Sequence, residues 1–253
     1  MNPYQSVAHD HSPGSPDRLQ RETPAAEVPE TGFGRWFLGT SIWSRYVVEP
    51  AVNELGALLP ADAVSPKRIL DVGCGPGAAL PLLDRRFRPR AMIAVDLDPR
   101  EVARARRPAA LCACPVEVRL GDAARLALAN ASVDLVFCHQ LLHHESRQAA
   151  ILRELHRVLV PGGALLLAES CRSFILSSSV QWLFAHPNEA QKSPAEYQEL
   201  VRQAGFVFNE DLVRTSTPFW SRPDWGLRAR LGWRSRRSLE ATQVTLVAIR
   251  PSS

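Results

Sequence analysis

The sequence predicts an α/β fold, in which a doubly wound, mostly parallel sheet carries helices on both faces and a helical cap near the N-terminus. Two observations favour this fold. Short runs of Val, Ile and Leu alternate with segments of helix length, and the first run is followed by a glycine-rich turn. Hydrophobic residues occupy 45% of the 253 positions, which is enough for a substantial core in one domain.

The N-terminal part differs in composition from the rest of the chain. Residues 1–31 are polar and carry prolines at 3, 13, 16, 24 and 29, so we expect a disordered tail there. Aromatic and aliphatic residues dominate 32–64, where we expect a helical cap. The aromatic side chains of this cap would pack on the main domain, 65–253, or over a ligand; they are Trp36, Phe37, Trp43 and Tyr46.

Six short apolar runs predict strands. They lie at 68–72, 91–96, 116–120, 133–138, 164–168 and 244–249. Runs that are apolar on both faces are typical of parallel strands covered by helices. Segments of helix length separate the first five runs, and this alternation implies right-handed βαβ units in one sheet.

Two helix starts are visible in the sequence. Residues 98–101 read Asp-Pro-Arg-Glu, which places Asp98 at the N-cap and Glu101 three positions later, the spacing of a capping box. Residues 193–196 repeat the pattern with Ser-Pro-Ala-Glu. We expect the second helix to end at Gly205, because glycine readily adopts the left-handed conformation that follows a helix.

The turn after the first strand has glycine at alternate positions, Gly73, Gly75 and Gly77. Glycine is needed where the backbone turns with positive φ or approaches a ligand closely. A nucleotide-like ligand would then lie at the carboxyl ends of the strands. Asp71 precedes the first glycine by two residues, so its carboxylate would form the floor of the pocket, where it would attract a cationic amino group and repel a pyrophosphate.

The same turn also fits a second cofactor. Gly73, Gly75 and Ala78 satisfy the dinucleotide pattern G-x-G-x-x-G/A. Asp96 follows at the end of the second strand, about 20 residues on, as that fingerprint expects. Spacing alone therefore leaves NAD(P) open.

Residues 71–77, Asp-Val-Gly-Cys-Gly-Pro-Gly, resemble the D/E-x-G-x-G-x-G motif of class I S-adenosylmethionine (SAM)-dependent methyltransferases. The family's later motifs follow in order; they are similar to 94–99, 121–123, 134–139 and 157–163. The resemblance covers roughly 65–170 and weakens over 32–64 and 171–253, where such enzymes differ by substrate. It implies a Rossmann-like sheet of seven strands, SAM as the cofactor and methyl transfer as the activity.

The resemblance also implies roles for individual residues. Asp96 would hold the ribose hydroxyls, Leu97 would lie against the adenine, and Asp122 would contact the adenine amino group. The full expected cofactor set is Asp71, Gly73, Cys74, Gly75, Gly77, Asp96, Leu97, Asp122, Ala123 and His139.

His143 and His144 follow the fourth strand, whose carboxyl end should border the methyl acceptor. Because histidine titrates near neutrality, either side chain is a candidate base or acceptor contact. The alternative is that both begin the next helix and satisfy local hydrogen bonds. Methyl transfer from a sulfonium is a direct displacement that positioning and desolvation can promote, so a base is not obligatory.

The predicted substrate side combines the cap with 171–193, whose aromatic residues would suit a small, partly apolar acceptor or serve as ordinary core. A second unusual segment, 219–237, holds three tryptophans and six arginines. It would bind single-stranded nucleic acid, an acidic substrate or an anionic membrane surface, or form a solvated insertion.

We therefore favour a small-molecule methyltransferase. One alternative is an RNA or protein methyltransferase that uses 219–237; another is a non-catalytic SAM- or NAD(P)-binding protein. Residues 139–142 read His-Gln-Leu-Leu in place of N/D-P-P-Y/F, which argues against methylation of adenine or glutamine amino groups by that route. The net charge of +4 does not by itself argue for nucleic acid.

Five scattered cysteines indicate a reducing compartment. With no secretory signal and no apolar run of membrane-spanning length in the sequence, we expect a cytoplasmic protein. Cys112 and Cys114 are close together but lack a second ligand pair, so we expect no metal site. The sequence leaves the oligomeric state open.

Overall fold

The computed structural model describes residues 31–60, 66–184, 186–218, 221 and 240–252. The predicted disordered tail falls almost entirely outside these residues, and so does nearly all of the arginine- and tryptophan-rich segment 219–237.

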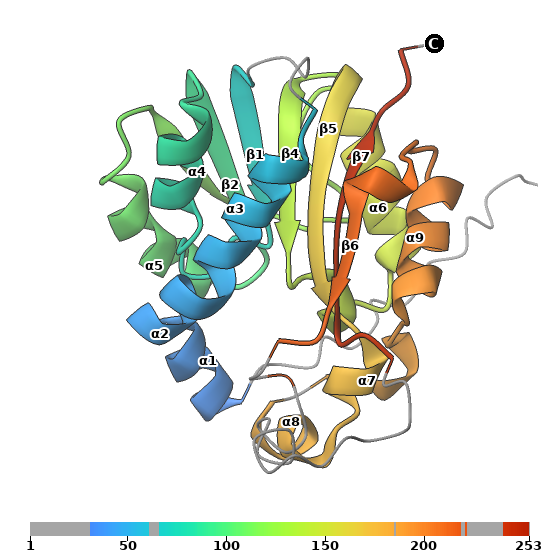
Figure 1. Cartoon of the computed structure of the whole chain (residues 1–253). Coiled ribbons are helices and arrows are strands. Elements are labelled where there is room, and N and C mark those ends of the chain that lie inside the picture. Colours follow the sequence, from blue (N-terminus) through green and yellow to red (C-terminus); the bar gives the residue numbers. More distant parts are fainter. Residues whose placement is uncertain (1–30, 61–65, 185, 219–220, 222–239, 253) are drawn as a thin grey trace, which may run out of the picture.

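One seven-stranded sheet forms the centre of the molecule, in the order β3-β2-β1-β4-β5-β7-β6 (Figure 1). The strands are β1 Arg68–Val72, β2 Ala91–Asp96, β3 Val116–Leu120, β4 Val133–His139, β5 Leu159–Ser170, β6 Val213–Ser216 and β7 Gln243–Ile249. Neighbouring strands from β3 to β5 pair in parallel, and β7 runs antiparallel to both β5 and β6. The predicted doubly wound, mostly parallel sheet is confirmed, and its mixed edge follows from β7.

Helices cover both faces of this sheet. They are α1 Gly32–Leu38, α2 Ser41–Trp43, α3 Glu49–Leu58, α4 Leu80–Phe87, α5 Pro99–Ala109, α6 Gln148–Val158, α7 Arg172–Ile175, α8 Ser178–Leu183 and α9 Pro194–Gln203. Shorter turns are the π-helical η1 Ser44–Val48 and the 3₁₀ turns η2 Leu142–His144, η3 Asn188–Ala190 and η4 Glu210–Leu212. One buried cluster packs α6 and α9 on the sheet, and a second packs α3, α4 and α5 on the other face.

The apolar runs locate most strands well. Strands β1, β2 and β3 have the predicted bounds, whereas β5 begins five residues before the predicted run at 164–168. The sequence analysis missed β6, because only Val213 of its four residues is buried and the other three are exposed, which leaves no apolar run to detect.

The two predicted capping boxes differ. In α9 the Ser193 side chain accepts from the Glu196 N–H, and the Glu196 side chain accepts from the Ser193 N–H. In α5 the Asp98 side chain caps Arg100 instead, and Glu101 pairs with Arg104 at 2.7 Å, so the box predicted there does not close. Gly205 has φ +95° after α9, which confirms the predicted left-handed residue.

Two covering segments meet at the carboxyl ends of the parallel strands. The helices α1 and α2 lie on one side of this edge, and α7 and α8 on the other (Figure 1). The Thr31 hydroxyl donates to the Leu183 carbonyl at 2.7 Å, and the Phe33 and Phe184 rings meet edge to face. Helix α3, by contrast, packs over a sheet face, so the segment predicted as a cap covers two surfaces. No helix among the described residues is long and apolar enough to cross a bilayer.

Candidate functional site

The glycine turn after β1 sits at the carboxyl edge of the sheet. The backbone N–H groups of Gly73 and Cys74 donate to the Val95 carbonyl at 2.8 and 3.1 Å, which ties the turn to the end of β2. Gly73, Gly75 and Gly77 all have positive φ, at +66°, +51° and +80°. The expected glycine turn with positive φ is therefore present.

The three glycines differ in what surrounds them. A Cβ on Gly73 would lie 2.8 Å from Leu141 Cδ1, and one on Gly77 would lie 3.0 Å from the backbone of Ala105 in α5. A Cβ on Gly75 would meet nothing within 4 Å. Gly73 and Gly77 thus allow close packing inside the protein, and the open space lies beside Gly75.

Asp71 forms the floor beneath this turn. Its side chain is 2% exposed, and its Oδ2 atom has no hydrogen-bond partner among the described residues. Burial, with a smaller contribution from Asp96, raises the pKa of Asp71 to about 8. A buried acceptor without a partner is costly. The arrangement therefore favours a ligand that brings a cationic donor to this oxygen.

Backbone hydrogen bonds orient the Asp96 carboxylate at the end of β2. Its Oδ2 accepts from the Gly75 N–H at 2.7 Å and its Oδ1 from the Asp98 N–H at 2.9 Å. These bonds orient the carboxylate and leave lone pairs for two further donors. Leu97, the next residue, is 38% exposed and offers an apolar surface beside it.

Asp122 has a partner that the sequence analysis did not foresee. Both of its carboxylate oxygens bond to the Arg147 guanidinium, at 2.9 and 3.1 Å, and one also caps the Ala124 N–H. An adenine amino group would have to share this carboxylate with Arg147. The neighbouring Ala123 is buried in the core cluster, so only its backbone could contact a base.

Cys74 and His139 complete the expected cofactor set. Burial raises the pKa of the Cys74 thiol well above its usual range, so the side chain is a neutral neighbour of the turn. Burial lowers the pKa of His139 to about 4. The His139 ring contacts Trp43 from α2 and stacks on Phe137.

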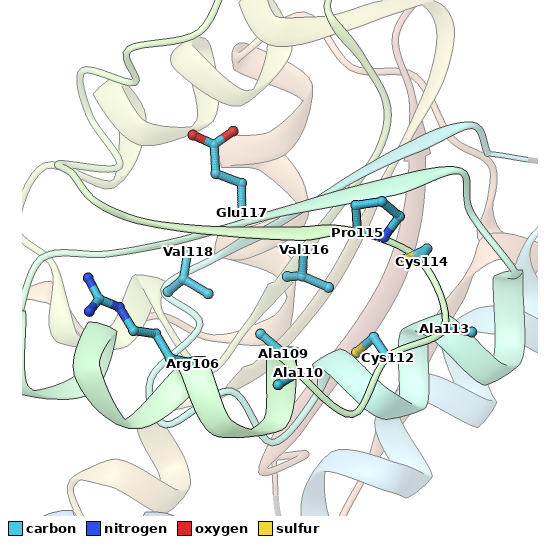
Figure 2. A pocket seen from close by; sticks show the side chains of 10 residues that line it. All are labelled: Arg106, Ala109, Ala110, Cys112, Ala113, Cys114, Pro115, Val116, Glu117 and Val118. Atoms are coloured by element: carbon cyan, nitrogen blue, oxygen red, sulfur yellow. The ribbon is translucent and has the colours of Figure 1, made fainter.

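A cavity of about 160 Å³ lies next to His139, between the cap and the ends of β4 and β5. Its lining includes Tyr46 and Pro50 from the N-terminal segment, and Gln140 and Glu169 from the sheet. Two larger hollows, one of about 640 Å³ beside Cys112 and Cys114 (Figure 2), lie at the amino ends of β2 and β3, away from the glycine turn.

His143 and His144 lie in η2, directly after β4. The Nδ1 atom of His143 is 2.7 Å from the Glu169 Oε2, and the other Glu169 oxygen accepts from the N–H groups of Leu141 and Leu142 at 2.9 and 2.8 Å. Burial first, and neighbouring histidines second, hold the pKa of both His143 and His144 well below the ordinary value. The two rings are neutral at pH 7 and are weak bases.

The sequence analysis missed Glu169. This residue is fully buried, and burial raises its pKa to about 8 against the opposing effect of its hydrogen bonds. One signal could have identified it, because Glu169 follows an apolar strand run directly, as Asp96 does in β2. His186 lies in the segment 171–193 that was expected on the substrate side, and its ring centroid is 4.6 Å from that of His144.

The aromatic residues expected on the substrate side divide into two groups. Phe33, Phe37, Trp43 and Phe184 contact one another across the seam between the two covering segments. Trp36, Tyr46 and Trp182 are 63%, 54% and 83% exposed, so most of their surface faces solvent.

Comparisons with known proteins find methyltransferases. Residues 70–167 match the family model described as "Methyltransferase domain". A malonyl-[acyl-carrier protein] O-methyltransferase of Dechloromonas aromatica is 32% identical over 64% of this chain and 59% of its own length. A probable SAM-dependent methyltransferase of Mycolicibacterium smegmatis is 35% identical over 57% of this chain and 53% of its own length.

The chain thus spans little more than half of these two relatives. A crystal structure of a SAM-dependent methyltransferase from Mesorhizobium loti superposes with a TM-score of 0.59 at 19% identity, over 84% of this chain and 99% of that one. That likeness concerns the fold, including its seven-stranded sheet.

Proposed function

We propose that this chain transfers the methyl group of SAM to a small-molecule acceptor. Its motifs and the match of residues 70–167 to a methyltransferase domain support a class I SAM-dependent methyltransferase. The observation that carries the proposal is the aromatic seam of Phe33, Phe37, Trp43 and Phe184, in which Trp43 contacts His139 at the carboxyl end of β4. Aromatic side chains with a few polar groups suit a small, partly apolar molecule.

SAM is the cofactor, and the chain offers fitting partners for it. The unpaired Oδ2 of Asp71 would accept from the cofactor's ammonium group. Asp96 would accept from the ribose hydroxyls, and Leu97 would cover the adenine. The open space at Gly75 leaves room for the ligand against the backbone. Bound SAM supplies an electrophilic methyl group on a sulfonium.

The residues of the acceptor side would act chiefly by positioning. An acceptor in the cavity beside His139 and Gln140 would lie next to the end of β4, and the covering aromatic rings would exclude water from it. Orientation and desolvation of this kind supply much of the rate of a direct displacement. The neutral ring of His144 remains a candidate contact for an acceptor proton, whereas Nδ1 of His143 is already engaged by Glu169.

One experiment tests the proposed function. The purified chain is incubated with methyl-labelled SAM and a metabolite extract, and labelled products are identified by mass spectrometry. We expect label in a small molecule, and none with the Asp71→Asn variant. Label in protein or RNA alone would overturn the small-molecule proposal, and SAM binding without any labelled product would favour the non-catalytic alternative.

Calorimetry separates the two cofactors that the spacing of the glycines left open. We expect one SAM per chain and no heat from NAD or NADP. Binding of a dinucleotide at the same turn would contradict the role given to Asp71, because that role requires a cationic donor beside its side chain and not a pyrophosphate.

A further inference from the structure

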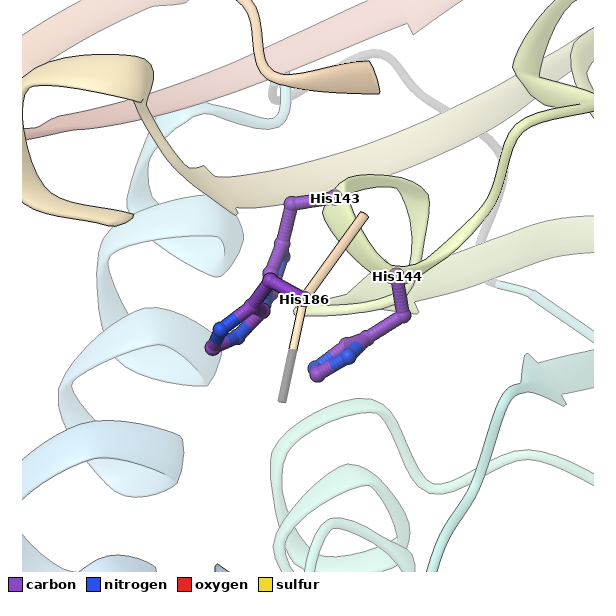
Figure 3. A group of neighbouring side chains, drawn as sticks. All are labelled: His143, His144 and His186. Carbon is purple, nitrogen blue, oxygen red and sulfur yellow. The ribbon is translucent and has the colours of Figure 1, made fainter. Parts of the chain in front are cut away.

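Three histidines meet where the sequence analysis expected no metal. One ring nitrogen from each of His143, His144 and His186 lies within 4.8 Å of the other two (Figure 3). The ring centroids are 4.2 Å apart for His143 and His144, and 4.6 Å apart for His144 and His186. We propose that these three side chains form a binding site for a divalent transition metal ion of the Zn²⁺ class.

The spacing of the three rings suits such an ion. Bonds of about 2.1 Å from zinc to imidazole place the nitrogens of a tetrahedral site about 3.4 Å apart. Small ring rotations would bring the cluster to this distance. Three imidazoles without a thiolate suit zinc and its neighbours in the first transition row, and leave a fourth position for water or an oxygen donor of a bound molecule.

Metal-bound histidines usually donate their second ring N–H to a carboxylate or a carbonyl, and Glu169 is placed to accept from His143. Its Oε2 lies 2.7 Å from Nδ1 of His143, which leaves Nε2 as the free nitrogen of that ring. A carboxylate behind a metal-bound imidazole fixes the ring and its tautomer, because a cation at Nε2 favours the form with hydrogen on Nδ1. The two N–H groups that Glu169 accepts, from Leu141 and Leu142, hold it in place.

Two buried glutamines join the two chain segments that carry the ligands. The Gln148 side chain donates to the carbonyls of Leu142 and Ala190, both at 2.8 Å. The Gln191 side chain donates to the carbonyls of His143 and Pro187, at 2.7 and 2.9 Å. The turn with His143 and His144 is therefore fastened to the segment with His186, which preorganises a site made from distant parts of the sequence.

His186 adds an independent observation. Its Nδ1 atom is buried and has no hydrogen-bond partner among the described residues. A buried ring nitrogen without a partner costs free energy unless something outside the chain satisfies it. A metal ion among the three rings would lower that cost by engaging this nitrogen or by reorienting the ring.

The test measures metal binding by the whole chain, with any affinity tag removed and prior metal stripped by a chelator. Zinc content is determined by mass spectrometry and affinity by calorimetry. Cobalt(II) then serves as a spectroscopic probe of imidazole coordination. The variants His144→Ala and His186→Ala remove ligands that are only partly buried. The variant His156→Ala is the matched control, since His156 lies in α6 against Phe206, outside the cluster.

We expect one zinc ion per chain in the wild type and in His156→Ala, with affinity at least tenfold weaker in both ligand variants. Glu169→Gln should weaken binding 10- to 100-fold, as for other outer partners, and alter the cobalt spectrum while three ligands remain. Equal affinity in the wild type and both ligand variants, or less than one ion per wild-type chain, would overturn the site.

A second measurement guards against misfolded variants. Zinc should raise the melting temperature of the wild type and His156→Ala, and leave that of the ligand variants unchanged. If a ligand variant fails to fold, the wild-type cobalt spectrum decides, because a spectrum without imidazole coordination contradicts the proposal. No readout here depends on methyl transfer, so failure of the metal site and failure of the proposed function are distinguishable.

Discussion

Asp71 and Glu169 are buried acids at the carboxyl edge of the same sheet, and they differ in what they bind. Both side chains are at most 2% exposed, and burial raises the pKa of each to about 8. Glu169 accepts from two backbone N–H groups and meets His143, whereas Oδ2 of Asp71 has no partner among the described residues. Hydrogen bonds within the protein offset the free-energy cost of burying Glu169. For Asp71, we expect a ligand to offset that cost.

The two acids are also connected through one side chain. Glu169 holds the backbone of Leu141, and the Leu141 side chain packs where Gly73 lacks a Cβ. The segment after β4 therefore supports the glycine turn from behind. We expect Glu169 to contribute chiefly to stability and Asp71 chiefly to the proposed binding of SAM, and substitutions can separate the two contributions.

The largest expected effect is on stability. Glu169→Ala leaves two N–H groups and a histidine without their partner, so we expect the free energy of unfolding to fall by about 3–5 kcal/mol. Urea unfolding followed by circular dichroism measures it. The exposed capping residue serves as the control, and Glu196→Ala should cost about 1 kcal/mol. Equal losses in both variants would show that the bonds of Glu169 contribute little.

Asp71→Asn should weaken SAM binding without lowering stability. We expect SAM affinity to fall at least 100-fold, about 2.7 kcal/mol, because a buried partner of the ammonium is lost. Stability without ligand should not fall. Calorimetry gives the affinity, and Asp134→Asn is the control, since Asp134 binds the N–H groups of Lys67 and Arg68 at the other end of β1. Unchanged affinity in Asp71→Asn would refute the comparison.

Two glycine variants sharpen the contrast within the turn. Both positions have positive φ, so alanine costs about 1–2 kcal/mol of strain at each. Gly77→Ala should lose about 1–3 kcal/mol more through its contact with Ala105. Gly75→Ala should instead lose SAM affinity about tenfold, because its methyl group enters the ligand space. Thermal melts and calorimetry on both variants check this. If Gly75→Ala lost the extra stability and Gly77→Ala lost the SAM affinity, the result would be inconsistent with the open space at Gly75.

The last expected effect is a dependence of stability on pH. Asp71 has a pKa of about 8 in the folded chain against 3.8 for an ordinary aspartate side chain, so the folded state keeps a proton that the unfolded state has lost between these values. Stability should therefore fall as pH rises from 4 to 8, and fall less in Asp71→Asn. Unfolding titrations at several pH values measure the slope. Equal slopes in the two proteins would contradict the raised pKa.

The sequence predicted the glycine turn and strands β1 to β3 better than the other half of this edge. Asp71 and Asp96 lie in local motifs, and β1 to β3 are short runs rich in Val, Ile and Leu, so nearby residues carry the information. The partners of Glu169 lie 26 to 28 positions away, and His186 meets His143 only through tertiary packing. Contacts of that kind depend on the completed fold and leave no local pattern.

One local rule failed where a second partner competed for a side chain. Glu101 has the spacing of a capping box, but its carboxylate pairs with Arg104 one turn later in α5, because a charged partner of this kind outweighs a neutral N–H. Asp122 fits the third family motif and pairs with Arg147, which lies 25 positions away, so its contact with adenine stays a prediction.

The contact between Gly77 and Ala105 has a consequence for how related sequences change. The missing side chain at 77 makes room for the small one at 105, with 3.0 Å between a would-be Cβ and the Ala105 backbone. Only a small side chain therefore fits at position 105 against the neighbouring turn, although this position lies on a helix. Across homologues we expect the two positions to covary, with bulk appearing at 105 only where α5 has shifted outward.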